Sequence, residues 1–191
     1  MQSVGVLNPP HESRGRKMNA TIKDILERRS CRKFKSESVP KELIEQIIEA
    51  GLYAANGMGQ QAPKIIAVTD KELRDRISED NRKIGGWDEG FDPFYGAPVI
   101  LIVIAPNDWR NKVYDGSLVM GNLMLASHAL GLGSIWIHRA KEEFEQDYYK
   151  ELLAKLGLEG EWEGIGHCAI GYAEGDLPKA APRKEGRVLW A

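Results

Sequence analysis

The sequence predicts one domain that combines helices with a single central sheet, and three observations lead to this fold class. Its 191 residues are 42% hydrophobic and 28% charged, which is ordinary for one globular domain with a sizeable core. The longest apolar run, APVILIVIA over 97–105, has the length of a buried strand and falls far short of the about 20 residues of a membrane-spanning helix. Apolar residues at helical spacing precede and follow this run.

On pattern alone, the alternation of helices and strands favours a doubly wound α/β fold. However, the sequence contains neither GxGxxG nor GxxxxGK[ST], the glycine-rich loops that hold phosphates in many such proteins. Any phosphate bound by this chain is therefore expected to be held without a glycine loop.

Two helices are expected near the start of the domain. Thr21 and Asp24 resemble a capping box, and the helix that they open should end near Arg29, because the following CRKF alternates like an extended segment. Pro40 suits the first turn of a second helix, which should fray at Gly51.

The middle of the chain predicts a strand, a helix and a second strand. KIIAVTD over 64–70 is typical of a short strand, and Thr69 with Glu72 is expected to cap the next helix. A loop rich in glycine and aromatic residues then leads to the buried strand over 99–104.

The second half predicts two further helices and two further strands. The longest helix is expected over 113–130, with Gly116, Gly121 and Ala126 allowing close packing. GLGSIWIH then begins a strand, 144–157 forms an amphipathic helix closed by a glycine, and 164–173 forms the last central strand. The segment after it is rich in proline and ends in the apolar VLW, which we expect to be buried against another surface.

Composition excludes several classes of protein. The 26 basic and 28 acidic residues argue against a nucleic-acid binder, and no membrane span is expected. The two cysteines form no CxxC motif, and the first 17 residues lack an apolar signal segment, so we expect a cytoplasmic protein with a flexible arm over 1–20 and one domain over 21–191. We expect no metal, because the histidines lack ligand spacing: His11, His128, His138 and His167.

A basic cluster, ERRSCRKF over 27–34, places four cations within six positions although the net charge is only −2. The simplest explanation is a helix C-terminus, where cations interact well with the helix dipole. Two distant stretches suggest a second explanation: AANGMGQQAPK over 54–64 and PRKEGRVLW over 182–190.

Taken in this order, the three stretches resemble the motifs of the FMN-dependent nitroreductase family, over about Thr21 to Trp190. The resemblance implies an α+β fold, with a central mixed or antiparallel sheet flanked by helices. It also implies a homodimer with FMN at its interface, and NAD(P)H as the reductant.

The resemblance assigns the basic cluster to the flavin. Arg28 and Arg183 match the phosphate-binding positions, and Arg29 and Ser30 belong to the same stretch of backbone. Arg32 matches a cation at the pyrimidine edge of the ring, where it would stabilise the negative charge of the reduced flavin. The residue types fit, because a guanidinium binds a phosphate through two hydrogen bonds at once.

The second stretch matches a loop that reaches the partner's flavin in the resembling family, and it carries Ala55, Asn56, Met58 and Gly59. It departs from the usual pattern, because Asn56 replaces a serine and Gly59 replaces an asparagine. Main-chain contacts can persist there, but Gly59 has no side-chain amide to offer.

Three more positions match flavin contacts. Asn81 corresponds to an asparagine that contacts the ring, and His138 and Arg139 lie where the family presents main-chain N–H groups to the N5 and O4 edge. We expect no protein acid, base or nucleophile, because the flavin carries the chemistry.

Several side chains allow two interpretations. His138 is either an acid or a local hydrogen-bonding residue, and His167 and Cys168 are expected in the core. Cys31 lies among cations that would lower its pKa, but no His or Asp is placed to activate it. Four aromatic residues belong either to the core or to the wall of a substrate pocket: Trp87, Phe91, Phe94 and Tyr95.

The sequence therefore predicts an FMN-dependent oxidoreductase that passes a hydride from NAD(P)H to a nitroaromatic or quinone by a ping-pong mechanism. One alternative keeps the fold but changes the reaction, to a desaturation or a dehalogenation. A second is a flavin-binding protein without activity, which would bind FMN but not oxidise NAD(P)H. A third, a helical interaction module without a cofactor, would be colourless.

Overall fold

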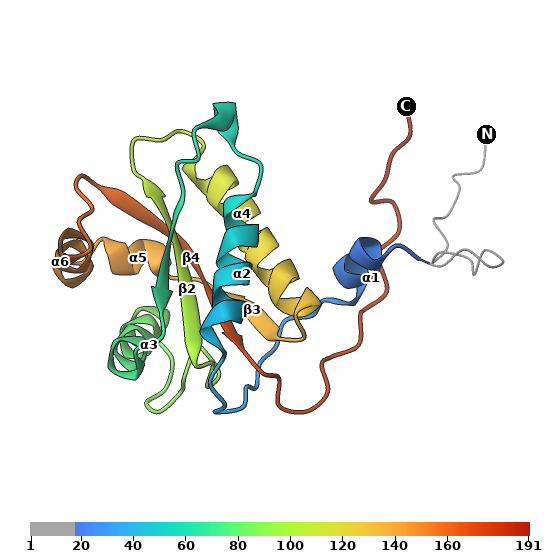
Figure 1. Cartoon of the computed structure of the whole chain (residues 1–191), viewed down its shortest axis with the longest axis horizontal. Coiled ribbons are helices and arrows are strands. Elements are labelled where there is room, and N and C mark those ends of the chain that lie inside the picture. The colour runs from blue at the N-terminus through green and yellow to red at the C-terminus, as the bar shows by residue number, and fades with distance from the viewer. Residues whose placement is uncertain (1–17) are drawn as a thin grey trace.

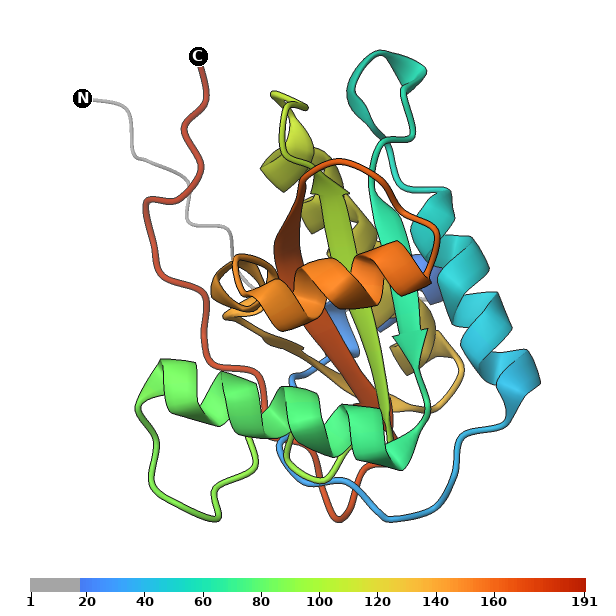
Figure 2. The same ribbon diagram turned by 90° about the vertical axis from the view of Figure 1, so that its left-hand side faces the viewer.

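A four-stranded antiparallel sheet lies between two layers of helices in the computed structural model, which describes residues 18–191 (Figure 1). Helices α2 and α4 cover one face of the sheet, and α3, α5 and α6 cover the other (Figures 1 and 2). The elements are α1 (Ala20–Glu27), α2 (Lys41–Leu52), η1 (Gly57–Gly59), β1 (Lys64–Val68), α3 (Lys71–Gly85), β2 (Val99–Pro106), α4 (Lys112–Ala129), β3 (Gly133–Ile137), α5 (Ala140–Phe144), α6 (Asp147–Lys155) and β4 (Trp162–Gly171).

The strand order is β1-β2-β4-β3, and every neighbouring pair is antiparallel. The doubly wound arrangement suggested by the alternation of elements is therefore wrong, whereas the α+β class is confirmed. A β-bulge between Val103 and Ile104 of β2 leaves Ile165 of β4 unpaired. Ile165 packs against Gly116, where an added Cβ would overlap its side chain, so Gly116 provides the close packing that was expected of α4.

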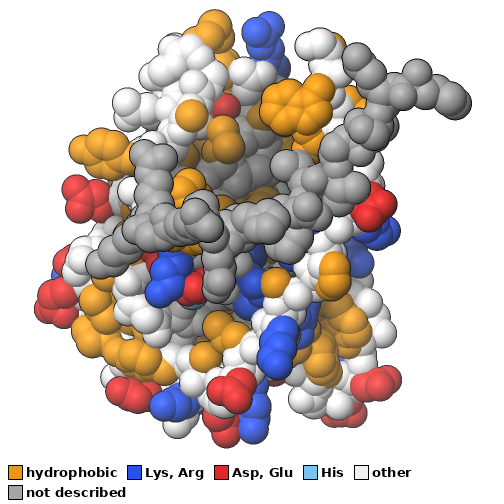
Figure 3. Space-filling model, turned by 90° about the vertical axis from the view of Figure 1, so that its right-hand side faces the viewer, with side chains coloured by type: hydrophobic (Ala, Val, Ile, Leu, Met, Phe, Trp, Pro, Cys, Tyr) orange, Lys and Arg blue, Asp and Glu red, His pale blue; other side chains and the backbone are white. Residues whose placement is uncertain are grey.

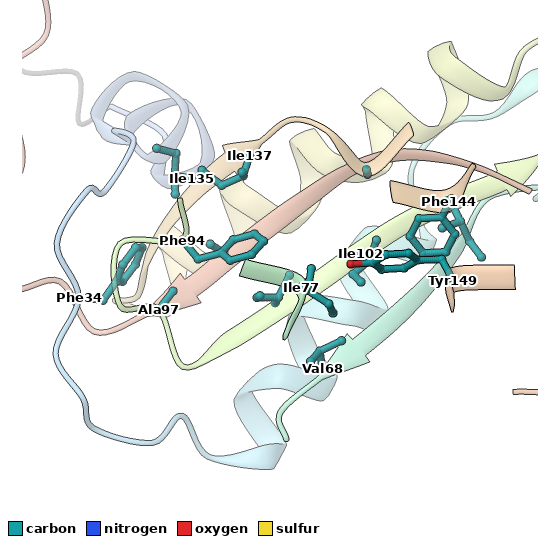
Figure 4. Close-up of a cluster of buried hydrophobic side chains, with 14 of the residues drawn as sticks. Phe34, Val68, Ile77, Phe94, Ala97, Ile102, Ile135, Ile137, Phe144 and Tyr149 are labelled. Carbon is teal, nitrogen blue, oxygen red and sulfur yellow. The ribbon is translucent and has the colours of Figure 1, made fainter. Parts of the chain in front are cut away.

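Strand β2 divides the core into two halves. Ile100, Ile102 and Ile104 face α3, α5 and α6, while Leu101 and Val103 face α2 and α4. This alternation follows from the period of two in a strand and explains the continuous apolar run, because both faces of β2 are buried. Figure 4 shows the first half of the core, in which Phe94 lies near Ile135 and Ile137, and Tyr149 lies against Phe144.

Two predicted helix caps were wrong for local reasons. Asn19, and not Thr21, caps α1, because its side chain accepts hydrogen bonds from the main-chain N–H groups of Thr21 and Ile22. Similarly Asp70, and not Thr69, caps α3 through Leu73. The helix expected over 144–157 is α6, and the short helix α5 before it was not predicted. Residues 1–17 of the arm predicted over 1–20 lie outside the described residues. Of the remaining three, Ala20 is already the first residue of α1.

Of the four aromatic residues in the loop before β2, Phe94 is confirmed as core, and the wall of a substrate pocket stays a prediction for the others. Phe94 is fully buried in the core, whereas Trp87 and Phe91 keep 40% and 38% of their surface exposed. The loop is held by Asp92, which accepts hydrogen bonds from Arg74 and Ser78. Burial would raise the pKa of Asp92, but these hydrogen bonds and the Arg74 charge outweigh it and lower the pKa.

Helix α1 and the C-terminal segment expose apolar side chains. Nothing in α1 is buried, and Ile22, Ile25 and Leu26 are about half exposed. In the C-terminal segment, Leu189 and Trp190 are 90% and 87% exposed, so the burial expected for VLW does not occur within one chain. Figure 3 views this side of the molecule, where exposed hydrophobic side chains lie beside Lys and Arg.

Over residues 18–191, no helix has the length and apolar character needed to cross a membrane. The same residues contain no group of three or more His, Cys, Asp or Glu side chains that could hold a metal ion.

The contact between β4 and α5 gives a test of the packing. A Cβ at Gly164 would overlap the main-chain carbonyl group of Ala140. We therefore expect Gly164→Ala to lower the free energy of unfolding by about 1–3 kcal/mol, as overpacking does. Gly121→Ala is the control, because Gly121 lies in α4 with no atom within 4 Å of an added Cβ, and this variant should gain about 0.5–1 kcal/mol. Urea unfolding measures both variants, and equal stabilities would contradict the packing.

Candidate functional site

The end of α1 presents two arginine side chains with buried polar atoms that lack partners. Arg28 is the C-cap of α1, and its main-chain N–H donates to the carbonyl of Asp24. Among the described residues, the buried atoms Arg28 Nη1 and Arg29 Nε make no hydrogen bond. An unpaired buried donor costs about 1–3 kcal/mol, and more when it is charged. Such a cost is offset when an anion binds there.

Arg29 also serves the helix. Its Nη1 donates to the carbonyl oxygens of Leu26 and Arg28 at 2.7 and 2.6 Å, so it satisfies groups that the end of a helix leaves without partners. The explanation of the basic cluster as cations at a helix C-terminus therefore holds for Arg29 Nη1. It does not account for the buried Nη1 of Arg28.

The segment after Arg29 pairs with the edge of the sheet. Ser30 forms a parallel bridge with Ser134 of β3, and the main-chain N–H of Cys31 donates to the Ser134 carbonyl at 3.0 Å. This pairing explains the extended CRKF stretch and fixes the basic cluster to one end of β3. Arg32 is exposed, and the neighbouring Lys33 forms a surface ion pair with Glu174 at 3.1 Å.

Neither cysteine is activated. Cys31 is buried against Gly133 and Phe34, and this burial raises the pKa of its thiol, although its contact with the main chain of Lys33 partly opposes the rise. The expectation that neighbouring cations lower this pKa was wrong, because the side chain points into the core. Burial also raises the pKa of Cys168 to about 12, with the Arg28 charge only partly opposing it.

An open pocket of about 320 Å³ lies at the other end of β3. Arg139 follows the strand with φ +81°, a left-handed conformation that costs a residue with a side chain about 1–2 kcal/mol. Its guanidinium forms an ion pair with Glu142 at 3.0 Å. The lining residues are His138, Arg139, Lys141, Glu142, Gly164 and Ile165.

Strand β3 joins the two halves of the site. Ser134 lies beside the basic cluster and His138 follows the strand at the pocket, so about four residues, or roughly 14 Å, separate them.

Asn81 and His138 are brought together by the fold. The Asn81 side chain is fully buried, and its Nδ2 donates to the main-chain oxygen of His138 and to Glu143 Oε1, both at 2.7 Å. Its Oδ1 is buried without a partner among the described residues, and it is an acceptor, which is what the N3–H of a flavin requires. The predicted contact between Asn81 and the ring stays a prediction, for which Oδ1 is the available atom.

The predicted partner loop lies elsewhere. Figure 1 places η1, which contains Met58 and Gly59, above the N-terminal end of α4, whereas α1 lies beside the other half of that helix. The loop is anchored by the buried Asp115 of α4, which accepts from the Gly57 N–H at 3.0 Å and from Trp109 Nε1 at 2.7 Å. Asn56 Oδ1 accepts from the Gln61 N–H and closes the turn, while Ala55 is exposed.

Arg183 lies in the exposed segment after β4. No hydrogen bond or ion pair of the described residues joins it to the end of α1. The structure of one chain therefore unites Arg28, Arg29 and Ser30, and separately Asn81 with His138. It shows no bond from Arg183 or the 55–59 loop to either group among residues 18–191.

Sequence reasoning missed two buried acids. Glu143 looks like a surface residue in a short amphipathic helix, and no local signal distinguishes it from Glu142. Asp115 lies in the first turn of α4, where acids are common for electrostatic reasons. Only tertiary packing shows that each one holds main-chain or side-chain donors from distant segments.

Several solved structures resemble the fold. A nitroreductase of Bacteroides fragilis, solved with bound FMN, is 26% identical with a TM-score of 0.80, and the match covers 91% of this chain and 100% of that one. A nitroreductase of Desulfitobacterium hafniense with bound FMN is 27% identical with a TM-score of 0.81, over 92% and 100% of the two chains.

Curated relatives match over a smaller share of their length. An FMN reductase [NAD(P)H] of Bacillus subtilis is 29% identical over 140 residues, which are 62% of this chain and 53% of that protein. A relative from Methanothermobacter thermautotrophicus is 32% identical over 129 residues, and the chain spans 60% of its length.

The Nitroreductase family matches residues 25–172, which is more than half of the chain and includes the basic cluster, the η1 loop and both ends of β3. With the antiparallel sheet and the fold neighbours above, this match shows that the chain belongs to the nitroreductase family.

Proposed function

We propose that this protein is an FMN-dependent oxidoreductase that uses NAD(P)H to reduce nitroaromatic or quinone-type acceptors. The observation that carries the proposal is the pair of features at the two ends of β3. A buried guanidinium atom of Arg28 has no partner among residues 18–191, and an open pocket lies at His138 and Arg139. The names of the relatives support the choice of cofactor and reductant.

The residues present fit FMN. Arg28, Arg29 and Ser30 would hold the phosphate, and the main chain of His138 and Arg139 would face the N5 and O4 edge of the ring. The unpartnered Oδ1 of Asn81 provides an acceptor for a ring N–H. Arg32 is exposed and free to face the pyrimidine edge, where a cation favours the reduced flavin.

FMN supplies the hydride chemistry when bound, with NAD(P)H as donor and the nitro compound or quinone as acceptor. The protein binds the cofactor, orients it and sets its electrostatic surroundings. No side chain is assigned a proton transfer, and Cys31 and Cys168 take no part because burial keeps both thiols protonated.

The complete site needs two copies of the chain. The loop that carries Met58 and Gly59 lies near the N-terminal end of α4 and away from α1, so we assign the loop and the basic cluster at one flavin to different chains. A twofold dimer brings the loop of one chain to the basic cluster of the other through a single self-complementary surface. It would also bury the exposed apolar side chains of α1 and of the C-terminal segment.

The phosphate assignment is tested by Arg28→Ala and Arg183→Ala. Each should weaken FMN binding by about 1.5–3 kcal/mol, because each removes a hydrogen bond to a charged group. Lys33→Ala is the matched control, since Lys33 is a cation of the same cluster that is engaged with Glu174 on the surface. Titration of the apoprotein with FMN, followed by flavin fluorescence, measures the affinities. Wild-type affinity in both arginine variants would remove the assignment.

The reaction is tested by steady-state kinetics. If reductant and acceptor occupy the same face of the flavin in turn, double-reciprocal plots with NADH or NADPH against a quinone or nitroaromatic should give parallel lines. Intersecting lines would contradict the shared site. A yellow protein that binds FMN but does not oxidise either nucleotide would instead be a flavin-binding protein without this activity.

The dimer is tested by sedimentation of the FMN-bound protein at low micromolar concentration. We expect a homodimer, and added FMN should raise its melting temperature because the ligand binds only the assembled site. Ile25→Asp on the exposed face of α1 should produce monomers with weaker FMN binding. Leu156→Asp, at a similarly exposed position after α6, should leave the dimer intact. A flavin-saturated monomer would refute the two-chain site.

A further inference from the structure

A buried polar network lies directly behind the pocket. Asn81 of α3, Glu143 of α5 and His167 of β4 are each 0% exposed. Glu143 Oε1 accepts from Asn81 Nδ2, and Glu143 Oε2 lies 2.7 Å from His167 Nε2. Three elements that are distant in sequence therefore meet at one carboxyl group.

The hydrogen bonds set the orientation of each group. The contact between Glu143 Oε2 and His167 Nε2 requires one proton between the two atoms, whichever of them carries it. The two neighbours of Asn81 Nδ2 are oxygen atoms, so the reverse orientation of the amide would place oxygen against oxygen. The rings of Phe94 and His167 pack edge to face, with centroids 5.3 Å apart, so this neighbour offers the imidazole no hydrogen bond.

The network holds the main chain that reaches the pocket. Asn81 Nδ2 donates to the His138 carbonyl oxygen at 2.7 Å, and His167 Nδ1 lies 3.4 Å from the Ile137 carbonyl oxygen. These two carbonyl groups immediately precede Arg139, which lines the pocket in a left-handed conformation. A residue with a side chain keeps such a conformation only where its surroundings hold it.

We propose that the Glu143–His167 pair is a positioning device for the flavin edge. It orients the Asn81 amide and, through Asn81 and Ile137, holds the main chain at 137–139 in the geometry that contacts the N5 side of the ring. The pair thereby sets the relative affinity of the protein for reduced and oxidised FMN. This inference rests on the proposed function, because it requires FMN in the pocket.

The test compares two ways of changing the pair. Glu143→Gln keeps both contacts, since the Gln oxygen accepts from Asn81 and the Gln amide donates to His167. The double variant Glu143→Met with His167→Leu removes them and leaves apolar side chains of similar size, a replacement that buried charge pairs often tolerate. Tyr149→Phe is the control, because it removes a hydrogen bond from Tyr149 to Asp80 in the same core without touching 137–139.

The readout is the ratio of the dissociation constants of reduced and oxidised FMN, obtained from the midpoint potential of bound flavin. The double variant should change this ratio about tenfold, which is about 30 mV for a two-electron couple. Glu143→Gln and Tyr149→Phe should stay within twofold of the wild type. In the apoprotein, hydrogen exchange over 137–140 should become faster only in the double variant.

The outcomes separate the inference from the proposed function. A wild-type protein that does not bind FMN overturns both. A wild-type protein that binds FMN, with an unchanged ratio and unchanged exchange in the double variant, overturns the positioning role alone and leaves the pair a purely structural contact.

If the double variant does not fold, His167→Gln replaces it. This side chain still donates to Glu143 but loses the contact with Ile137, and it should change the ratio at least threefold. A wild-type ratio in a folded His167→Gln protein overturns the inference.

Discussion

The antiparallel pairing of β3 with β4 is the constraint on which the candidate site depends. It fixes five residues in register, from Gly133 opposite Gly171 to Ile137 opposite His167. At one end of β3, Ser134 binds the main chain of Cys31 and holds the basic cluster. At the other end, the chain turns into the left-handed Arg139 and the pocket. One short strand thus sets the distance between the two groups that the proposed cofactor must contact at once.

Some buried polar groups find their partners within the chain and others do not. Asp115 and Glu143 are satisfied from within the chain, and each one holds a segment of the candidate site. Among residues 18–191, four buried side-chain atoms lack partners: Arg28 Nη1, Arg29 Nε, Asn81 Oδ1 and Trp136 Nε1. Unpaired buried groups are costly, so the arginine donors at the proposed phosphate end and the Asn81 acceptor near the proposed ring end support the proposed ligand.

The exposed apolar side chains are unevenly distributed over the chain. Both faces of the sheet are covered by helices, yet α1 and the C-terminal segment keep large apolar side chains exposed. These are the segments that carry Arg28 and Arg183. The segments that expose apolar side chains in one chain therefore also carry the two arginines that the proposal assigns to the phosphate.

Local patterns in the sequence were enough for the elements. The apolar runs placed every strand to within a few residues, and the RRSCR motif marked the end of α1 as the candidate anion site, because helix ends and strand periodicity are encoded by neighbouring residues. Tertiary structure alone decided the antiparallel strand order, the inward orientation of Cys31, the burial of Glu143 and Asp115, and the placement of η1 away from α1. Each of these depends on which distant segments meet, and burial then sets the charge and hydrogen bonding of a side chain. Packing between distant elements decides these features, and no short stretch of sequence specifies that packing.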